Sequence, residues 1–102
     1  MAAETTTTAA MPSLDPSSLE AAGAFLRAAG LVFDDITATQ VTGHLMLGPE
    51  HHTPWGIVHG GVYATAIESA ASVGASAAVR DSGQVAVGLT NTTHFLRSVT
   101  QG

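Results

Sequence analysis

The sequence predicts an α+β fold in which one long helix follows two β-strands and precedes a third along the chain. Apolar side chains recur at helical spacing through residues 60–79, a period that strands do not show. Val, Ile and Thr dominate residues 31–47, and these residue types favour strands. From Gln84 onward, apolar residues alternate with small ones, which is typical of another strand. The chain of 102 residues has room for one small domain.

The N-terminal part is predicted to be a disordered tail followed by a first helix. Residues 1–14 are rich in Thr and Ala and show no periodicity, so they are assigned to the tail. Asp15 or Ser17 can cap the helix start, because either side chain offers an oxygen to free backbone N–H groups. Pro16 suits the first helical position, and Gly30 is typical of a helix end.

Residues 31–47 are predicted to form two strands joined near residues 38–40. The phase of the apolar alternation changes at Asp34 and Asp35, which indicates a β-bulge or a bend. Residues 50–58, EHHTPWGIV, carry Pro and Gly and are predicted to form a loop that leads into the long helix.

The composition excludes several classes of function. The chain has no Lys, only 11% charged residues and a net charge of -5, so it lacks the basic patch that nucleic-acid binding needs. It has no Cys, which excludes thiolate zinc sites. No apolar run reaches the roughly 18 residues of a membrane span, and the N-terminus has no secretory-signal pattern, so a cytoplasmic location without membrane contact is expected. So few charges cannot cover a surface, which favours burial against a second copy.

One carboxylate, Glu68, lies in the middle of the long helix. Its helix face otherwise carries small hydroxyl residues, which let other backbone approach closely, so we expect the helix to be enclosed on most sides. An unpaired carboxylate is costly to bury, and a residue kept at such a cost is a candidate for chemistry. The alternative is that Glu68 lies on a wet face among Ser and Thr.

The start of the long helix is a candidate binding site. Gly60 and Gly61 leave backbone N–H groups uncovered by side chains. Free N–H groups at the positive end of a helix dipole favour an anion or a polarised carbonyl oxygen.

These features coincide in a motif. GIVHGGVYATAIESAAS, preceded by PEHHTPW and followed by NTTHFLRSVTQG, resembles the PaaI-type acyl-CoA thioesterases of the hotdog fold. The most specific parts are G-x-x-H-G-G with an acidic residue nine positions after the His, and T-N-x-x-x-F-L-R. The resemblance implies a long helix wrapped by a curved antiparallel sheet. It also implies a homodimer or homotetramer in which two subunits join their sheets edge to edge.

The resemblance also implies roles for four residues. Glu68 matches the acidic residue that attacks the thioester or activates water, and Gly60 matches the residue whose N–H polarises the thioester carbonyl. His59 matches the loop histidine beside it. Ser72, one turn after Glu68, matches a hydroxyl position that orients water.

Substrate contacts are predicted around the same loop. Relatives often carry Gln or Asn where this chain has Thr53, and His52 is the neighbour that can substitute for that contact. Gly61 offers an N–H, and Arg97 either meets a CoA phosphate or is a plain surface residue. A metal site at the loop histidines is the weaker alternative because their spacing is not that of a helical H-x-x-x-H, so no metal and no other cofactor is expected.

The predicted function is hydrolysis of an aromatic or medium-chain acyl-CoA to a free acid and CoA. Relatives continue beyond the equivalent of Gly102, so residues 15–102 are expected to be the N-terminal two-thirds of a hotdog thioesterase domain. The alternative function is that of a non-catalytic, truncated hotdog fragment, or a binding or dimerisation module. A hotdog dehydratase is less favoured, because the D-x-N-P-x-H signature is absent.

Overall fold

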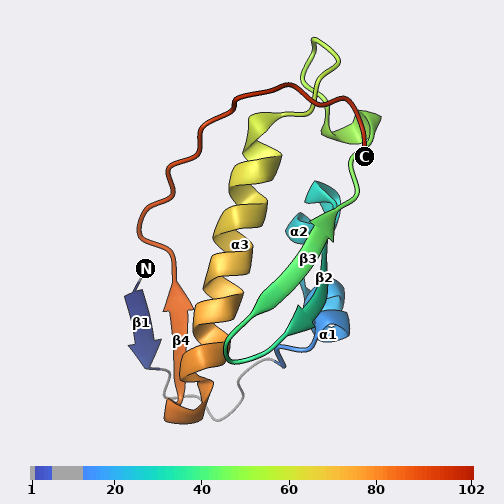
Figure 1. Ribbon diagram of the computed structural model, residues 1–102. Helices are drawn as coiled ribbons and strands as arrows, with labels where there is room; N and C mark the ends of the chain where they lie inside the picture. The colour runs from blue at the N-terminus through green and yellow to red at the C-terminus, as the bar shows by residue number, and fades with distance from the viewer. Residues whose placement is uncertain (1, 6–12) are drawn as a thin grey trace.

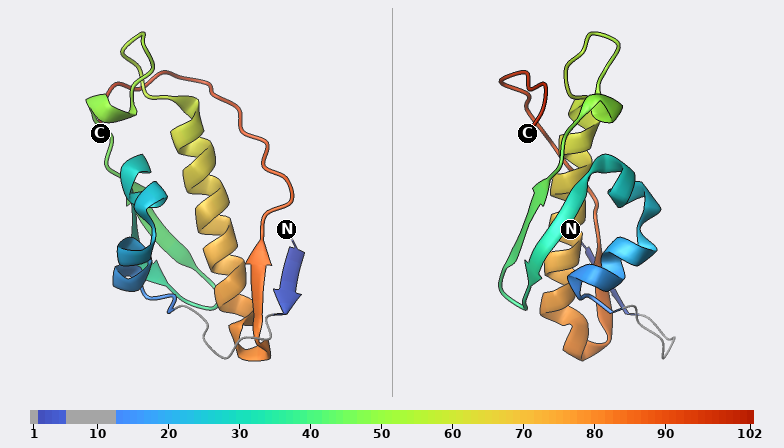
Figure 2. Two further views of the ribbon diagram at one scale, coloured as in Figure 1. Left: turned by 180° about the vertical axis from the view of Figure 1, so that it is seen from behind. Right: turned by 90° about the vertical axis from the view of Figure 1, so that its right-hand side faces the viewer.

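The computed structural model describes residues 2–5 and 13–102 of the chain (Figure 1). A long helix runs through the middle, with a β-hairpin on one side and a second pair of strands on the other. Two short helices cover one face of the hairpin (Figure 2). The predicted α+β class with a long central helix is confirmed. The elements are β1 (Ala2–Thr5), α1 (Pro16–Ala22), α2 (Ala24–Ala29), β2 (Leu31–Ile36), β3 (Val41–Leu45), α3 (Gly60–Val79) and β4 (Gln84–Val87), with 3-10 turns at Pro49–His51 and Arg80–Ser82.

The N-terminal segment differs from the predicted tail. Ala2–Thr5 form β1 and pair antiparallel with β4, from Ala2 opposite Val87 to Thr5 opposite Gln84. A strand edge needs partners for its N–H and C=O groups, and backbone of any composition can supply them. The missing periodicity therefore could not reveal this strand. Residues 1 and 6–12 of the predicted tail lie outside the described residues.

The cap of α1 is Asp15, one of the two predicted candidates. Its Oδ1 accepts the N–H of Ser18 at 3.1 Å, and Pro16 takes the first helical position as expected. The hydroxyl of Ser13 also donates to this carboxylate, as do those of Ser17 and Ser18. These hydrogen bonds hold the pKa of Asp15 well below its usual range because they favour the charged form, and the bond from Ser13 has the largest effect.

The single first helix of the prediction is in fact two helices. The helix is interrupted at Gly23, whose φ of -104° and ψ of 75° lie outside the helical range. A residue without a side chain adopts such a conformation at little cost, so one helix ends and the next begins there. Gly30 ends α2 in the left-handed conformation, with φ of 82°, so the predicted helix end is confirmed.

The predicted hairpin is confirmed together with its irregularity. β2 and β3 pair antiparallel, and the register shifts between Phe33 and Asp35, where the alternation changes phase. The N–H of Thr37 donates to the carbonyl of Gln40 at 2.8 Å and closes the turn. Phe33 is buried, in a strand that contacts both short helices and α3.

The last predicted strand is shorter than expected. Alternation continues to Leu89, but β4 ends at Val87 because no neighbouring strand continues beside it among the described residues. Residues 88–102 run back along α3 toward its first turn (Figure 1). Their end is fixed by two hydrogen bonds between Leu47 and Gly102, of 2.8 and 3.3 Å.

The expected enclosure of α3 is not found in the described part of the chain. There, two separate two-stranded sheets flank the helix, rather than one curved sheet. Ser76 is its one buried residue, and its hydroxyl is bonded to Ala86 of β4. Glu68 and Ile67 are exposed in the single chain, as the wet-face alternative expects for Glu68, and the role of Glu68 stays a prediction.

We expect Gly30→Ala to lower the free energy of unfolding by about 2–4 kcal/mol. The left-handed conformation alone costs a side-chain-bearing residue about 1–2 kcal/mol, and a Cβ on Gly30 would also collide with the carbonyl oxygen of Met46. Gly83→Ala is the matched control, because Gly83 has φ of 72° but open space around it. Urea unfolding of both variants measures the difference, and equal losses would contradict the contribution of the Met46 contact.

Candidate active site

The start of α3 is organised by His59. His59 is the N-cap, and its Nδ1 accepts the N–H of Gly61 at 2.9 Å. Because the amide must be the donor, Nδ1 carries no proton and the neutral ring carries its proton on Nε2. The Gly61 N–H is therefore engaged by His59, which differs from the expectation that it is free for substrate.

The N–H of Gly60 is the free donor at this helix start. Within residues 2–5 and 13–102 it donates to no acceptor, as expected for a first-turn N–H group. The ring of Phe95 lies against the Cα of Gly60, because a Cβ built on Gly60 would be 2.8 Å from Phe95 Cζ. A residue without a side chain is thus what lets an aromatic ring approach this turn of α3.

A pocket of about 500 Å³ opens around Gly60. It brings together four of the predicted substrate or catalytic residues beside His59, namely Thr53, Gly60, Gly61 and Arg97. The ring of Tyr63 lies 6.3 Å from that of Phe95, measured between centroids. The hydroxyl of Tyr63 is buried and has no hydrogen-bond partner in the described part of the chain. Ile57, Val58, Tyr63, Phe95, Leu96 and Ser98 complete the lining.

His52 does not reach this pocket. Its Nε2 lies 2.6 Å from the carbonyl oxygen of Thr100, to which it donates, and so it holds the C-terminal segment. Thr53 does line the pocket, and its Oγ1 accepts the N–H of Trp55 at 3.3 Å. His52 lines a neighbouring pocket of about 430 Å³ that His59 and Gly61 also line, so its part in substrate contact stays a prediction.

Glu68 and Ser72 meet farther along α3. The hydroxyl of Ser72 donates to Oε1 of Glu68 at 2.8 Å, as their spacing of one turn predicts. Gly88 leaves room for this carboxylate, since a Cβ there would lie 2.5 Å from Oε1. The carboxylate borders an open pocket of about 390 Å³ that Asn91 also lines, and Asn91 Nδ2 donates to the carbonyl of Ala64 at 2.9 Å.

The pockets of Gly60 and Glu68 have no lining residue in common. Eight residues separate the two along α3, which corresponds to about 12 Å along the axis and to different faces of the helix. One thioester group therefore does not reach both within a single chain.

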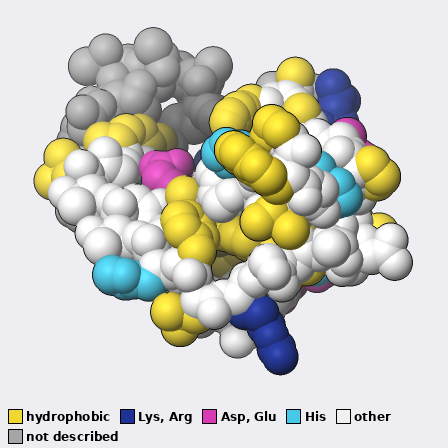
Figure 3. Space-filling view, turned by 90° about the horizontal axis from the view of Figure 1, so that it is seen from above, with side chains coloured by type: hydrophobic (Ala, Val, Ile, Leu, Met, Phe, Trp, Pro, Cys, Tyr) yellow, Lys and Arg dark blue, Asp and Glu magenta, His cyan; other side chains and the backbone are white. Residues whose placement is uncertain are grey.

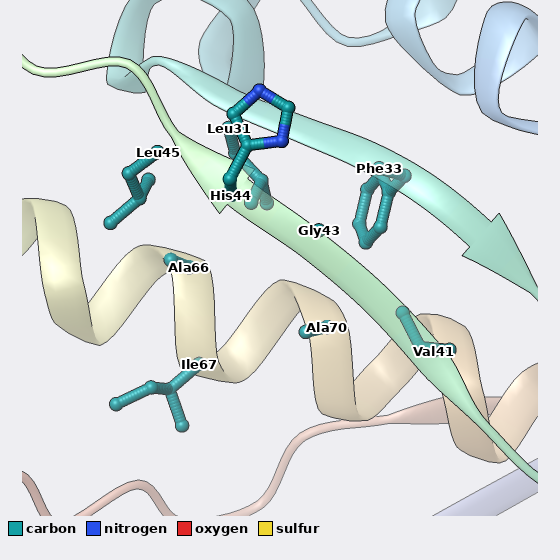
Figure 4. A pocket seen from close by; sticks show the side chains of 9 residues that line it. All are labelled: Leu31, Phe33, Val41, Gly43, His44, Leu45, Ala66, Ile67 and Ala70. Carbon is teal, nitrogen blue, oxygen red and sulfur yellow. The ribbon is translucent and has the colours of Figure 1, made fainter.

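An apolar groove of about 370 Å³ separates the hairpin from α3 (Figure 4). Ala66 and Ala70 face the hairpin across it, whereas the ring of His44 points away from the helix. His44 Nδ1 lies 2.9 Å from Asp34 Oδ2 on that outer side. None of the predicted catalytic residues lines this groove.

Hydrophobic side chains gather at the loop end of the molecule, with histidine side chains among them (Figure 3). Trp55 is 83% exposed and Leu96 is 94% exposed. Trp55 is therefore not packed in the core. The described helices include none that is long and apolar enough to cross a membrane. Among the described side chains, no group of three or more His, Asp or Glu is placed to hold a metal ion.

Sequence reasoning missed three residues that shape these pockets. Phe95 lies against Gly60, Asn91 lines the pocket of Glu68, and Gly88 makes room for the Glu68 carboxylate. Asn91 and Phe95 belong to the T-N-x-x-x-F-L-R motif, so the motif contained a signal for both. Gly88 had no such signal, because its role depends on how residues 88–102 pass α3.

Comparison with known proteins identifies the family. Residues 56–102 match the sequence profile of the Thioesterase superfamily. The chain is 45% identical over 53 residues to 1,4-dihydroxy-2-naphthoyl-CoA thioesterase 2 of Arabidopsis thaliana. The matched residues make up 52% of this chain and 34% of that relative. The chain is 36% identical over 94 residues to a Mycobacterium tuberculosis protein provisionally named an esterase, which is 89% of this chain and 67% of that relative.

The solved structure of this M. tuberculosis esterase is also similar. It matches with a TM-score of 0.72 and 37% identity over 76% of this chain and 63% of that chain. The chain thus spans from about a third to about two-thirds of the length of the relatives it matches. At the level of the thioesterase superfamily, the resemblance seen in the sequence is confirmed by profile, identity and fold together. The chain belongs to the thioesterase superfamily and has the hotdog fold.

Proposed function

We propose that the protein hydrolyses an acyl-CoA thioester to a free acid and CoA. The observation that carries the proposal is the free N–H of Gly60, at the positive end of α3, on the wall of a pocket with apolar sides. Such a donor stabilises the negative charge that develops on a thioester carbonyl oxygen during attack. Membership of the thioesterase superfamily supports this reaction class.

Glu68 is the proposed base or nucleophile. As a base it takes a proton from water, whose oxygen attacks the thioester carbon; the C–S bond then breaks, and the leaving sulfur takes up that proton to give CoA. As a nucleophile its oxygen attacks the thioester carbon, the C–S bond breaks to release CoA, and water then hydrolyses the mixed anhydride to the free acid and the free carboxylate. The hydroxyl of Ser72, which donates to Glu68 Oε1 at 2.8 Å, supports a role in orienting the carboxylate or that water.

We further propose that two copies of the chain share each site. Gly60 and Glu68 line separate pockets of one chain, and two antiparallel α3 helices related by two-fold symmetry would place Gly60 of each beside Glu68 of the other. A homodimer is the smallest such assembly, and a homotetramer built from such dimers fits equally.

PaaI-type grouping and a cytoplasmic location stay predictions from the sequence.

The proposed substrate carries an aromatic or a medium-chain acyl group. The Tyr63–Phe95 pair beside Gly60 favours an aromatic one, since aromatic groups stack or meet edge to face. The Arabidopsis relative is named a 1,4-dihydroxy-2-naphthoyl-CoA thioesterase, and this aromatic acyl group points the same way. Arg97 on the same pocket is the proposed partner of a CoA phosphate.

A panel of acyl-CoA thioesters tests the proposal. We expect release of free CoA thiol from at least one aromatic or medium-chain thioester, measured continuously with a thiol reagent, and no requirement for added metal. A folded, self-associating protein that hydrolyses no thioester of the panel but still binds acyl-CoA would contradict the enzyme proposal. That outcome would support the binding-module alternative.

A further inference from the structure

The imidazole of His51 is buried and fully hydrogen-bonded. Its residue is 6% exposed. Its Nδ1 accepts the N–H of Gly48 at 3.0 Å, and its Nε2 lies 2.8 Å from the carbonyl oxygen of Ala28. Because the Gly48 amide must be the donor, Nδ1 is unprotonated, and Nε2–H donates to Ala28. One neutral tautomer satisfies both contacts.

The partner carbonyl belongs to the end of α2. The last four carbonyls of a helix have no intrahelical N–H, so Ala28 needs a donor from elsewhere. The imidazole of His51 is tightly packed, because a Cβ on Gly30 would lie 3.2 Å from His51 Nε2. The carboxylate of Glu50 lies 3.7 Å from Nδ1 but is exposed, and Nδ1 is already occupied by Gly48. The side chain thus joins α2 to the following loop through the Ala28 bond.

The backbone of His51 continues this connection to the candidate site. The N–H of His59 donates to the carbonyl of His51 at 2.8 Å. Inside the loop, Thr53 N–H donates to the Ile57 carbonyl at 2.8 Å. The two ends of residues 51–59 therefore meet at His51 and His59, and His59 caps α3 directly before Gly60.

We propose that His51 is a positioning residue for the thioesterase site. Its Nε2–H bond to Ala28 attaches the 51–59 loop to α2 at the point where the two ends of the loop meet. The loop in turn sets the position of His59 and of the Gly60 N–H. This proposal rests on the proposed function of that N–H. Misplacement of a catalytic group by about 1 Å can cost about a hundredfold in rate, so a rigid base for this loop has a direct catalytic value.

Two substitutions test the two hydrogen bonds of the His51 imidazole separately. Gln at position 51 can place an amide N–H near the position of Nε2 and keep the Ala28 bond. Asn at this position can place an oxygen near Nδ1 and keep the Gly48 bond, but it is too short to reach Ala28. We expect His51→Asn to lower kcat by about ten- to a hundredfold with little change in KM. We expect His51→Gln to retain activity within about threefold of wild type.

His44→Asn is the matched control. His44 is also bonded through its ring, to Asp34, but on the exposed outer face of the hairpin. We expect it to leave kcat and KM unchanged. Equal losses in His51→Gln and His51→Asn would overturn the role of the Ala28 bond.

Amide hydrogen exchange gives a readout that does not depend on thioester hydrolysis. We expect faster exchange of the His59 and Gly61 amides in His51→Asn than in His51→Gln, because the loop base is released only in the first. If the wild type hydrolyses no thioester, the proposed function fails but this difference still supports the positioning role. Exchange that is equal in the two variants overturns that role even in an active enzyme.

Imidazole ¹⁵N shifts of the wild-type protein supply a test without any variant. At neutral pH we expect His51 to show an unprotonated Nδ1 and a protonated Nε2. The opposite tautomer, or a ring averaging between both, would overturn the proposal even where the His51 variants fail to fold.

Discussion

Replacing Glu68 with Gln is expected to lower kcat for thioester hydrolysis at least about a hundredfold, on the scale of lost acid–base catalysis. Gln keeps the size of Glu and an oxygen that can accept the Ser72 hydroxyl, but it neither takes a proton nor attacks a carbonyl. Because Glu68 is exposed on α3 the fold of the chain should persist, and because Gln has the shape of Glu the contacts with the second copy should persist as well. Steady-state kinetics with the best thioester of the panel measures the loss.

Ser72→Ala is the companion variant for Glu68→Gln. It removes the 2.8 Å hydrogen bond to the carboxylate but leaves the carboxylate itself. We expect a smaller loss, of about tenfold or less, which is the range of one positioning hydrogen bond. If Glu68→Gln turns over every substrate at the wild-type rate, Glu68 has no catalytic role.

Gly60→Pro is expected to reduce kcat by about a hundred- to a thousandfold, the range measured for removal of one oxyanion donor. Proline lacks the N–H, is tolerated at the first helical position, and follows a residue in extended conformation, here His59 with ψ of 130°. The Gly60 N–H makes no hydrogen bond within the described residues, so the fold does not depend on it. Kinetics and circular dichroism together separate loss of rate from loss of structure.

Gly60→Ala is the matched control for the new side-chain atoms. Both variants direct a Cβ toward the ring of Phe95, a residue that is 59% exposed. Only Gly60→Pro removes the N–H, so the ratio of the two rates isolates the donor. Equal activity of the two variants would mean that this N–H does not stabilise the transition state.

Local signals predicted much of the fold. The ends of α3, the cap at Asp15 and the bulge near Asp34 follow from residue types and spacings that act within a few positions. The pairing of β1 with β4 was not predictable, because it joins segments some eighty positions apart through backbone groups alone. The break at Gly23 was missed because one glycine is tolerated in many helices.

The candidate site was predicted in its residues but not in its contacts. The motif indicated Gly60 and Gly61 alike, yet the His59 ring engages only the Gly61 N–H. The spacing of residues along the chain does not determine how a side-chain ring is oriented. The exposure of Glu68 depends on what covers α3, which is a property of tertiary packing rather than of helix periodicity. The bonds of His51 to Ala28 and Gly48 likewise join segments that no sequence pattern connects.

The shared site is the central claim, and mixing two inactive variants tests it most directly. Glu68→Gln and Gly60→Pro are combined in equal amounts under conditions of subunit exchange, so that about half of the dimers are mixed. If each site takes Gly60 from one chain and Glu68 from the other, every mixed dimer has one intact site and one site with both lesions. Activity should then return to about a quarter of wild type. A mixture that stays inactive, although native mass spectrometry confirms mixed dimers, would contradict the shared site.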